Sequence, residues 1–263
     1  MNVGYISDIH FDMGGNCTLD WFDFETADVI IIAGDVGTMN DAYKFIERLA
    51  SKLPASHIIF VPGNHEYCND HHQRCMNELD QFFIKEVSAF DNVSYLPSGQ
   101  SITIRGVKFI GGTGWSDLGR DYSPNIELIC KHKVQTLAWD FDSIVMRSND
   151  NNVEYITCEE MQHLFDINKK NIISELDGYE GRSVVITHFA PGIEFRNEYF
   201  KLDNESYYFS GKMTDVIEKY QPNYWIYGHT HGRCNMVQHG DTIVLCNQQS
   251  TINRDYSLKY FQI

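Results

Sequence analysis

The stretch His57-Ile58-Ile59-Phe60-Val61-Pro62-Gly63-Asn64-His65-Glu66 decides how the rest of the chain is interpreted. The apolar, β-branched residues at its start are typical of a strand buried on both faces, and Pro62-Gly63-Asn64 is typical of a turn. In open α/β sheets, ligands bind outside the carboxyl ends of the strands. An amide and an imidazole at such an end are therefore natural site residues, although the turn alone is also ordinary loop chemistry. The interpretation depends on what the other strands carry.

Four other short apolar runs predict buried strands that end in polar residues of metal-binding type. Alone, each motif has a plain structural explanation, because an aspartate often caps a turn and a lone histidine is usually packed in a core. Ligand sites form where several such ends meet, so we expect these residues to lie together. The runs, with the residues that follow them, are Val3–Ser7 with Asp8 and His10, Asp28–Ala33 with Asp35, Ser183–Thr187 with His188, and Tyr224–Tyr227 with His229 and His231.

Amphipathic segments between these runs predict helices that cover the sheets. Residues 41–53 carry apolar side chains at helical spacing and end before Pro54, which gives a β-α-β unit. Thr157-Cys158-Glu159-Glu160 has the form of a capping box and begins a helix that ends near Gly178. Further helices are expected at 72–90 and 212–220, and a second sheet is expected to start with the short runs 93–96, 100–104 and 107–110 and to close with 242–247.

Two segments have less regular patterns. Residues 111–115 are rich in glycine but lack the spacing of a phosphate-binding loop, so we interpret them as a backbone bend beside the site. Residues 116–152 show no clean period, and we interpret them as an insertion over the site. We also expect Arg196 near the site, and His71 and His72 at its border.

The composition is that of an ordinary globular protein, with 43% hydrophobic and 22% charged residues in a chain of 263. No linker, repeat or low-complexity tract divides it, so a single domain spanning 1–263 is expected. The net charge of -15 opposes binding to a phosphate backbone, which relies on lysine and arginine. Nonspecific nucleic-acid binding is therefore disfavoured.

Cysteine usage and the amino terminus indicate where the protein resides. The seven cysteines are an odd number without a C-x-x-C pair, which is typical of reduced thiols in a reducing compartment. The amino terminus enters strand-like sequence without the basic and apolar regions of a signal peptide, and no run approaches about 18 apolar residues. We therefore expect a cytoplasmic protein without membrane spans.

The residues at the five strand ends form a ligand set for two divalent ions: two carboxylates, one amide and four imidazoles, besides His65. Mixed nitrogen and oxygen ligands suit Mn, Fe, Zn or Co better than Ca or Mg, and Mn²⁺ is the ion expected to serve in vitro. An aspartate that bridges two ions would hold them about 3.5 to 4 Å apart, the spacing used to hydrolyse phosphate esters.

Five motifs resemble, in order and spacing, the calcineurin-like metallophosphoesterase superfamily, over nearly the whole chain. These motifs are Asp8-x-His10, Gly34-Asp35, Gly63-Asn64-His65-Glu66, His188 and Gly228-His229-x-His231. The resemblance implies an α/β fold, a four-layer α/β/β/α sandwich of two mixed β-sheets flanked by helices. It also implies one metal site made of Asp8, His10, Asp35 and His231 and another made of Asp35, Asn64, His188 and His229, with Asp35 bridging.

The chemistry implied is in-line attack on phosphorus by a hydroxide that bridges two metal ions, because a bound divalent ion lowers the pKa of water to about 7. His65 is adjacent to a ligand without being one, so we expect it to protonate the leaving oxygen or to stabilise the transition state. We assign no chemistry to Glu66.

We therefore expect the substrate to be a phosphate-ester small molecule or a nucleotide, and the departures from the family narrow this expectation further. Protein phosphatases of this superfamily carry Gly-Asp-x-x-Asp-Arg-Gly, and residues 34–40 lack that second aspartate and the arginine. Residues 187–191 and 115–117 look closer to poorly characterised bacterial and phage members. We favour a small phosphodiesterase. The alternatives are a phosphomonoesterase, a nuclease related to DNA-repair exonucleases, and a non-catalytic protein-binding scaffold, which would be expected to have lost ligands.

Overall fold

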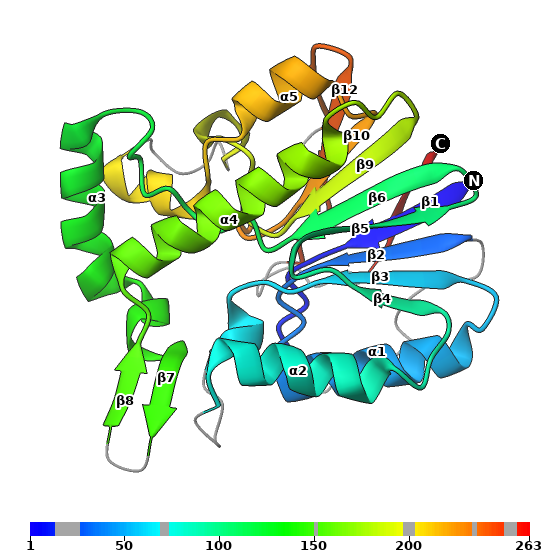
Figure 1. The fold of residues 1–263 in the computed structure, drawn as a ribbon, viewed down its shortest axis with the longest axis horizontal. Coiled ribbons are helices and arrows are strands. Elements are labelled where there is room, and N and C mark those ends of the chain that lie inside the picture. Colours follow the sequence, from blue (N-terminus) through cyan, green and yellow to red (C-terminus); the bar gives the residue numbers. More distant parts are fainter. Residues whose placement is uncertain (14–26, 69–73, 150–151, 197–202, 233–235, 250–256) are drawn as a thin grey trace.

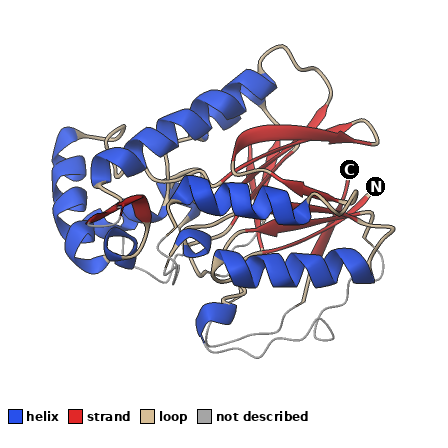
Figure 2. Ribbon diagram, turned by 60° about the horizontal axis from the view of Figure 1, so that its bottom comes forward, coloured by secondary structure: helices blue, strands red, loops and turns tan. Residues whose placement is uncertain are grey.

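The computed structural model describes residues 1–13, 27–68, 74–149, 152–196, 203–232, 236–249 and 257–263. Two β-sheets stack face to face, and helices cover the outer face of each (Figure 1). Helices α1 (Met39–Lys52) and α2 (Met76–Val87) cover one sheet, and α4 (Cys158–Leu176) and α5 (Thr214–Tyr220) cover the other. In the turned view, the helices again lie outside the strands (Figure 2). The predicted four-layer α/β/β/α class is confirmed.

The first sheet has five strands in the order β13-β1-β2-β3-β4. Strands β1 to β4 run parallel to one another. Strand β13 lies at the edge next to β1 and pairs with it antiparallel. The bounds are β1 (Asn2–Ile6), β2 (Val29–Ala33), β3 (His57–Val61), β4 (Val93–Tyr95) and β13 (Lys259–Gln262). The carboxyl ends of β1, β2 and β3 therefore lie at one edge.

The second sheet has six strands in the order β11-β12-β10-β9-β6-β5. Strands β12, β10, β9 and β6 are parallel, and antiparallel strands form both edges. The bounds are β5 (Ser98–Ile104), β6 (Val107–Gly112), β9 (Arg182–Thr187), β10 (Tyr224–Tyr227), β11 (Val237–His239) and β12 (Thr242–Cys246).

Alternate residues of a central strand face two different cores. In β2, Val29, Ile31 and Ala33 pack in the cluster between the sheets. Ile30 and Ile32 point the other way, into the cluster beneath the helices. All of them are fully buried, which explains why the run is apolar throughout instead of alternating. The same pattern in neighbouring strands fixes which residues point inward, and it leaves the polar residues for the strand ends.

The capping box predicted at Thr157 is present, and a second capping box, which had not been predicted, begins α1. The side chain of Thr38 accepts from the backbone amide of Asp41 at the start of α1, and Thr157 does the same with Glu160 at the start of α4. Each acidic side chain reaches back to its capping residue. Helix α2 begins at Met76, four residues later than predicted, and the stretch containing His71 and His72 lies outside the described residues.

Two strand assignments differ from the prediction. Residues 93–95 form β4, which pairs with β3 in the first sheet, so the second sheet begins only with β5. The reason is that α2 acts as a crossover helix and returns the chain parallel to β3. Residues 242–246 form β12, an inner strand, and the chain then returns to the first sheet as β13, which the sequence pattern had not indicated.

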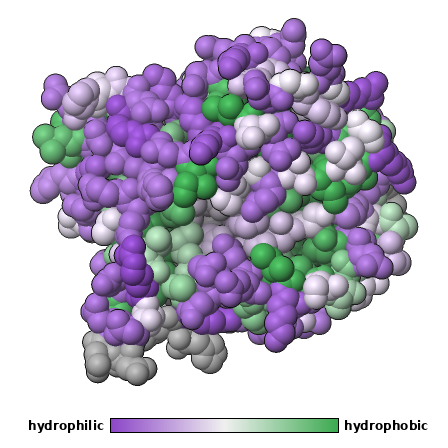
Figure 3. Space-filling view, in the orientation of Figure 1, coloured by the Kyte–Doolittle hydropathy of each residue, from purple (hydrophilic) through white to green (hydrophobic). Residues whose placement is uncertain are grey.

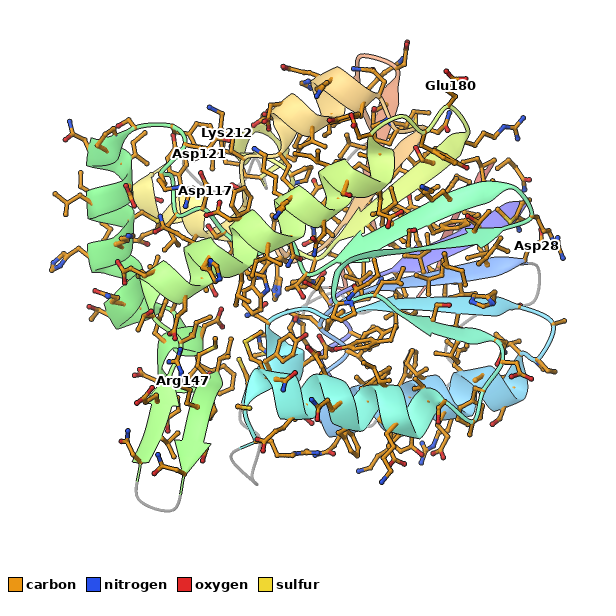
Figure 4. The ribbon with its side chains drawn as sticks, in the orientation of Figure 1. Asp28, Asp117, Asp121, Arg147, Glu180 and Lys212 are labelled. Carbon is orange, nitrogen blue, oxygen red and sulfur yellow. The ribbon has the colours of Figure 1, made fainter. Side chains whose placement is uncertain are left out.

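Residues 116–152 contain α3 (Pro124–Leu137), a 3₁₀ turn η4 (Trp139–Asp142) and β7 (Val145–Asn149). Strand β7 pairs with β8 (Asn152–Tyr155) in a hairpin that projects from the body, with Arg147 on it (Figure 4). The helical period of α3 was missed because only Cys130 and Val134 are buried, while three large apolar residues are exposed, namely Leu128, Ile129 and Leu137. The face of the molecule drawn in Figure 3 is mostly hydrophilic, with apolar side chains scattered over it.

Asp117 is a fully buried carboxylate in the loop before α3 (Figure 4). Its Oδ2 accepts a hydrogen bond of 3.0 Å from the backbone amide of Asp121, and its Oδ1 has no partner within the described part of the chain. Burial raises the pKa of the Asp117 carboxyl to about 6, although that hydrogen bond opposes the shift.

The cysteines only partly match the expectation of reduced thiols. Cys68, Cys75, Cys130 and Cys158 are free. Cys246 is disulfide-bonded, so the expectation is wrong for this residue, and its partner is not among the described residues. In the regions that the structure describes, no helix combines the length and the apolar character needed to cross a bilayer.

Candidate metal centre

The polar residues at five strand ends come together at the edge where the two sheets meet. Asp8 and His10 follow β1, Asp35 follows β2, Asn64 follows β3, His188 follows β9, and His229 and His231 follow β10. Backbone hydrogen bonds join the loops. The amide of Asp8 donates to the Gly34 carbonyl at 3.0 Å, and the amide of Gly228 donates to the His188 carbonyl at 2.8 Å. The cluster is thus built from both sheets.

The backbone at this cluster is strained. Five of the residues expected to bind metal have positive φ angles, a region that side chains other than glycine rarely adopt. They are Asp8 (59°), His10 (52°), Asp35 (55°), His229 (67°) and His231 (47°). The motif glycines are required for close packing, since a Cβ on Gly63 would collide with Asp35 Oδ1 and one on Gly34 would collide with His188 Nδ1. Such strain persists only where the surrounding structure enforces it, which is typical of functional sites.

One group of ligand atoms consists of side chains from Asp8, His10, Asp35 and His231, all within 4.8 Å of one another. The Nε2 atoms of His10 and His231 lie 3.1 Å apart. His231 Nε2 lies 3.4 Å from Asp8 Oδ1, and His10 Nε2 lies 3.7 Å from Asp35 Oδ2. Two imidazole nitrogens and two carboxylate oxygens therefore point at one small volume.

A second group consists of Asp35, His188 and His229, again within 4.8 Å. His188 Nδ1 lies 2.8 Å from the Ala33 carbonyl, to which it donates, so the lone pair of Nε2 faces the site. That Nε2 lies 3.2 Å from Asp35 Oδ2 without hydrogen-bond geometry. Asp35 belongs to both groups, which is the arrangement expected of a bridging ligand.

Several buried polar atoms at the cluster have no hydrogen-bond partner among the described residues. They include Asp35 Oδ2, Asn64 Oδ1, His188 Nε2, His10 Nδ1 and both ring nitrogens of His229. Leaving one such atom unpaired costs about 1–3 kcal/mol, so a group of them calls for a missing partner. Every one is an acceptor or a nitrogen that becomes one when deprotonated. Divalent cations are the partner that such a set fits.

The charge states of His229, His231 and Asp35 suit cations, whereas at His188 the effect of burial is outweighed by the charge of Asp35, which raises the pKa of the imidazole to about 9. Burial lowers the pKa of the His229 imidazole well below its usual value, and burial also lowers that of His231, so both rings are neutral. Burial alone would raise the pKa of Asp35, but the neighbouring His188 and His65 lower it well below its usual value. Asp35 is therefore anionic. Neutral imidazoles and an ionised carboxylate are the forms that bind metal ions.

Asn64 is oriented by a residue that the sequence analysis did not single out. Its Nδ2 donates to Asp140 Oδ1 at 2.9 Å, which turns the amide oxygen toward the cluster. The hydroxyl of Tyr208 donates to the other oxygen of Asp140 at 2.6 Å. Asp140 lies in η4, so residues 116–152 contact the site directly.

His65 lies beside the cluster and is held by Asp12. Its Nδ1 is 2.8 Å from Asp12 Oδ2, its backbone amide donates to Asp35 Oδ1 at 3.0 Å, and its Nε2 is 4.0 Å from Asp35 Oδ2. Burial lowers the pKa of His65, but the carboxylates of Asp35 and Asp12 outweigh it and raise the pKa to about 10. Residues 36–40 hold no carboxylate that could orient this histidine, and Asp12, two residues after His10, contacts its Nδ1 instead. Its position in Asp8-x-His10-x-Asp12 was the available signal.

Glu66 has a structural role that its place in a turn did not reveal. Its buried carboxylate accepts hydrogen bonds from the backbone amides of Gly63 at 2.6 Å, Val36 at 2.7 Å, Asp35 at 2.9 Å and Gly37 at 3.4 Å. Burial and the charge of Asp35 raise the pKa of Glu66 to about 7. Glu66 therefore ties the loop after β2 to the loop after β3 and positions both Asp35 and Asn64.

The remaining sequence assignments divide between the site and its surroundings. Of the predicted bend at 111–115, Gly111 and Gly112 instead end strand β6, while the next residue lies beside the site, since the Thr113 carbonyl accepts from the amide of His188 at 3.0 Å. Arg196 donates to the Ile193 carbonyl at 3.3 Å, and within the described residues it forms no hydrogen bond or ion pair with the cluster. His57 contacts Ser94 and His239 contacts Glu218, both away from the site.

The stacked sheets and the ligand groups at their strand ends define a class of metal-dependent phosphoesterases. Residues 1–233 match the model of the calcineurin-like phosphoesterase family, and the chain belongs to that family. It is therefore a metal-binding hydrolase of phosphoric esters.

Two known proteins are similar to the chain over most of its length. An uncharacterized protein of Acanthamoeba polyphaga mimivirus is 25% identical over 272 residues, which cover 93% of this chain and 89% of that protein. The crystal structure of phosphopantetheinyl hydrolase (PptH) from Mycobacterium tuberculosis aligns with a TM-score of 0.72 at 16% identity, covering 99% of this chain and 95% of that one. At this identity the likeness concerns the fold alone.

Proposed function

We propose that the chain hydrolyses small phosphodiesters with two divalent metal ions. One ion would be held by Asp8, His10, Asp35 and His231, and the other by Asp35, Asn64, His188 and His229. The observation that carries the proposal is that two groups of ligand atoms share Asp35, whose Oδ2 has no hydrogen-bond partner among the described residues, and that the second group adds the unpaired, buried nitrogens of His188 and His229. When bound, the ions would supply positive charge for the phosphoryl oxygens and lower the pKa of a water molecule.

Side chains of the protein would protonate the leaving group. Asp12 holds the Nδ1 side of His65, so the proton on Nε2 is the one available to the leaving oxygen. The backbone amide of His65 is tied to Asp35, which sets the distance between the acid and the cluster. His65 is thus proposed as the catalytic acid and Asp12 as its positioning residue.

The preference for a diester follows from charge. Within the described residues, no lysine or arginine forms a hydrogen bond or ion pair with any of the seven proposed metal ligands. A monoester dianion needs more positive charge for its neutralisation than a diester monoanion. Two metal ions without a lysine or arginine would therefore favour hydrolysis of the diester. The net charge of -15 argues against a long polyanionic substrate, which makes the nuclease a weaker alternative.

We also propose that 1–263 forms a single domain, with 116–152 as an insertion over the site. Asp140 of this segment contacts Asn64, which supports that arrangement.

We further propose a cytoplasmic location. Four free thiols support a reducing, cytoplasmic location, whereas the disulfide-bonded Cys246 argues against it.

The decisive experiment combines metal analysis with a substrate panel. Protein loaded with Mn²⁺ is tested for kcat/KM on p-nitrophenyl phosphate, bis-p-nitrophenyl phosphate, cyclic nucleotides, single-stranded oligonucleotides and a phosphopantetheinylated carrier protein. Two equivalents of metal and a diester rate at least equal to the monoester rate are expected. A monoester preference above about tenfold, or ~1.4 kcal/mol of transition-state discrimination, would overturn the diester assignment. Activity that survives complete removal of metal would overturn the metal mechanism, and no hydrolysis by the loaded protein would favour the scaffold.

A further inference from the structure

Two exposed aromatic side chains flank the candidate metal centre without belonging to either ligand group. Trp139 begins η4 and is 49% exposed, with its ring 5.8 Å from the ring of His65 in an edge-on contact. Phe209 ends η6 (Asn204–Phe209) and is 39% exposed, with its ring 5.2 Å from the ring of His229. Large apolar side chains that face solvent beside a reactive centre are available to a ligand.

A buried hydrogen bond fixes both aromatic residues relative to the site. Asp140 and Tyr208 are the sequence neighbours of Trp139 and Phe209, and the Tyr208 hydroxyl donates to Asp140 at 2.6 Å. Asp140 also accepts from Asn64 at 2.9 Å. The backbones that carry the two exposed rings are thus tied to each other and to the strand end after β3. Their positions are set by the folded chain before any ligand binds.

We infer that Trp139 and Phe209 bind a flat aromatic group of the substrate, such as the base of a nucleoside ester, with the leaving group at Trp139. The inference rests on the proposed function, because it assigns a substrate class to the same site. Trp139 contacts His65, the proposed acid, so a group that departs with the protonated oxygen would lie against the indole ring. Stacking of a base on an aromatic side chain needs no positive charge and tolerates different bases. This suits a site without contacting lysine or arginine in a protein of net charge -15.

A pair of inert ligands tests the inference by binding alone. Phenylphosphonate and cyclohexylphosphonate carry rings of equal carbon number, but only the phenyl ring is flat. In calorimetric titrations of the zinc-loaded protein, phenylphosphonate is expected to bind about tenfold more tightly. Trp139→Ala should reduce that ratio below about twofold while the Kd for cyclohexylphosphonate changes less than about twofold. Phe209→Ala should reduce the ratio partly.

Leu137→Ala is the matched control, because Leu137 is 67% exposed in the same segment and contributes no ring at the site. It should keep the full ratio. Equal affinities in the unaltered protein, no detectable binding of either phosphonate, or a ratio that survives Trp139→Ala would overturn the inference. Binding of inorganic phosphate and hydrolysis of bis-p-nitrophenyl phosphate by the same samples test the proposed function separately. If these persist without a ring preference, only the aromatic inference fails, and if hydrolysis is absent, the proposed function fails with it.

Discussion

Replacing Asp12 by asparagine removes one charge at nearly constant size and tests whether this residue positions His65. The Asp12–His65 contact is 2.8 Å long, and the two side chains are only 12% and 14% exposed. A hydrogen bond to a charged group is worth about 1.5–3 kcal/mol, which corresponds to about 10- to 150-fold in rate if the whole contribution is used in the transition state. We expect a loss of kcat of this size for substrates with a poor leaving group.

The leaving group separates a positioning role from a general structural one. A good leaving group such as p-nitrophenolate needs little protonation, so Asp12→Asn should reduce its kcat by less than about threefold. The assay compares p-nitrophenyl and unsubstituted phenyl esters of one diester series at saturating Mn²⁺. Asp12 Oδ1 also lies 3.6 Å from His10 Nδ1, so metal content must be measured on each sample.

A double variant completes the test. If Asp12 acts through His65, then Asp12→Asn in a His65→Asn background should cost almost nothing further. Equal losses for both leaving groups, accompanied by loss of metal, would refute the reasoning and assign Asp12 to the metal site.

Asp35→Asn should abolish hydrolysis and lower bound metal below two equivalents, since its carboxylate is common to both ligand groups; a variant with two metals and full turnover would disprove the bridging role. His229→Ala and His231→Ala should each deplete a different ion, and anomalous scattering that placed both histidines on one ion would reject the division. Asp117→Asn should raise stability at neutral pH. The folded-state pKa of about 6 lies above the unfolded value of 3.8, so stability is lost as pH rises between these values. The loss amounts to roughly 3 kcal/mol at 1.36 kcal/mol for each pKa unit. Urea denaturation from pH 4 to 8 should show a flatter profile for the variant, and parallel profiles would contradict the assignment.

The sequence predicted the buried strands because burial leaves a direct mark on a strand, whereas the four-layer arrangement of two sheets was implied by the family resemblance. A run such as Val29 to Ala33 is apolar throughout only if both faces are covered, and this indicates stacked layers before any contact is known. The order in which strands lie side by side within a sheet has no comparable signal in the sequence of each strand. Nothing in residues 93–95 distinguishes a partner of β3 from the first strand of a new sheet.

In the candidate site, too, some residues could be predicted from their local sequence and others could not. Its proposed ligands follow strands directly, so each is marked by its own sequence context. The residues that support them act across loops. Glu66 reaches amides 30 positions away, Asp12 meets His65 at a separation of 53, and Asp140 meets Asn64 at a separation of 76. No local pattern encodes such pairs, because each member alone is an ordinary polar loop residue.

The hydrogen bonds around Glu66 have a further consequence for how metal ions are taken up. Successive backbone amides that converge in this way form an anion-binding nest, and the chain fills it with a carboxylate of its own. A phosphate group cannot compete there, so the substrate's negative charge is left to the metal side. The same bonds order the loops that present Asp35 and Asn64 as part of folding. Metal ions then enter a preorganised site, and removing them with a chelator should leave the fold intact.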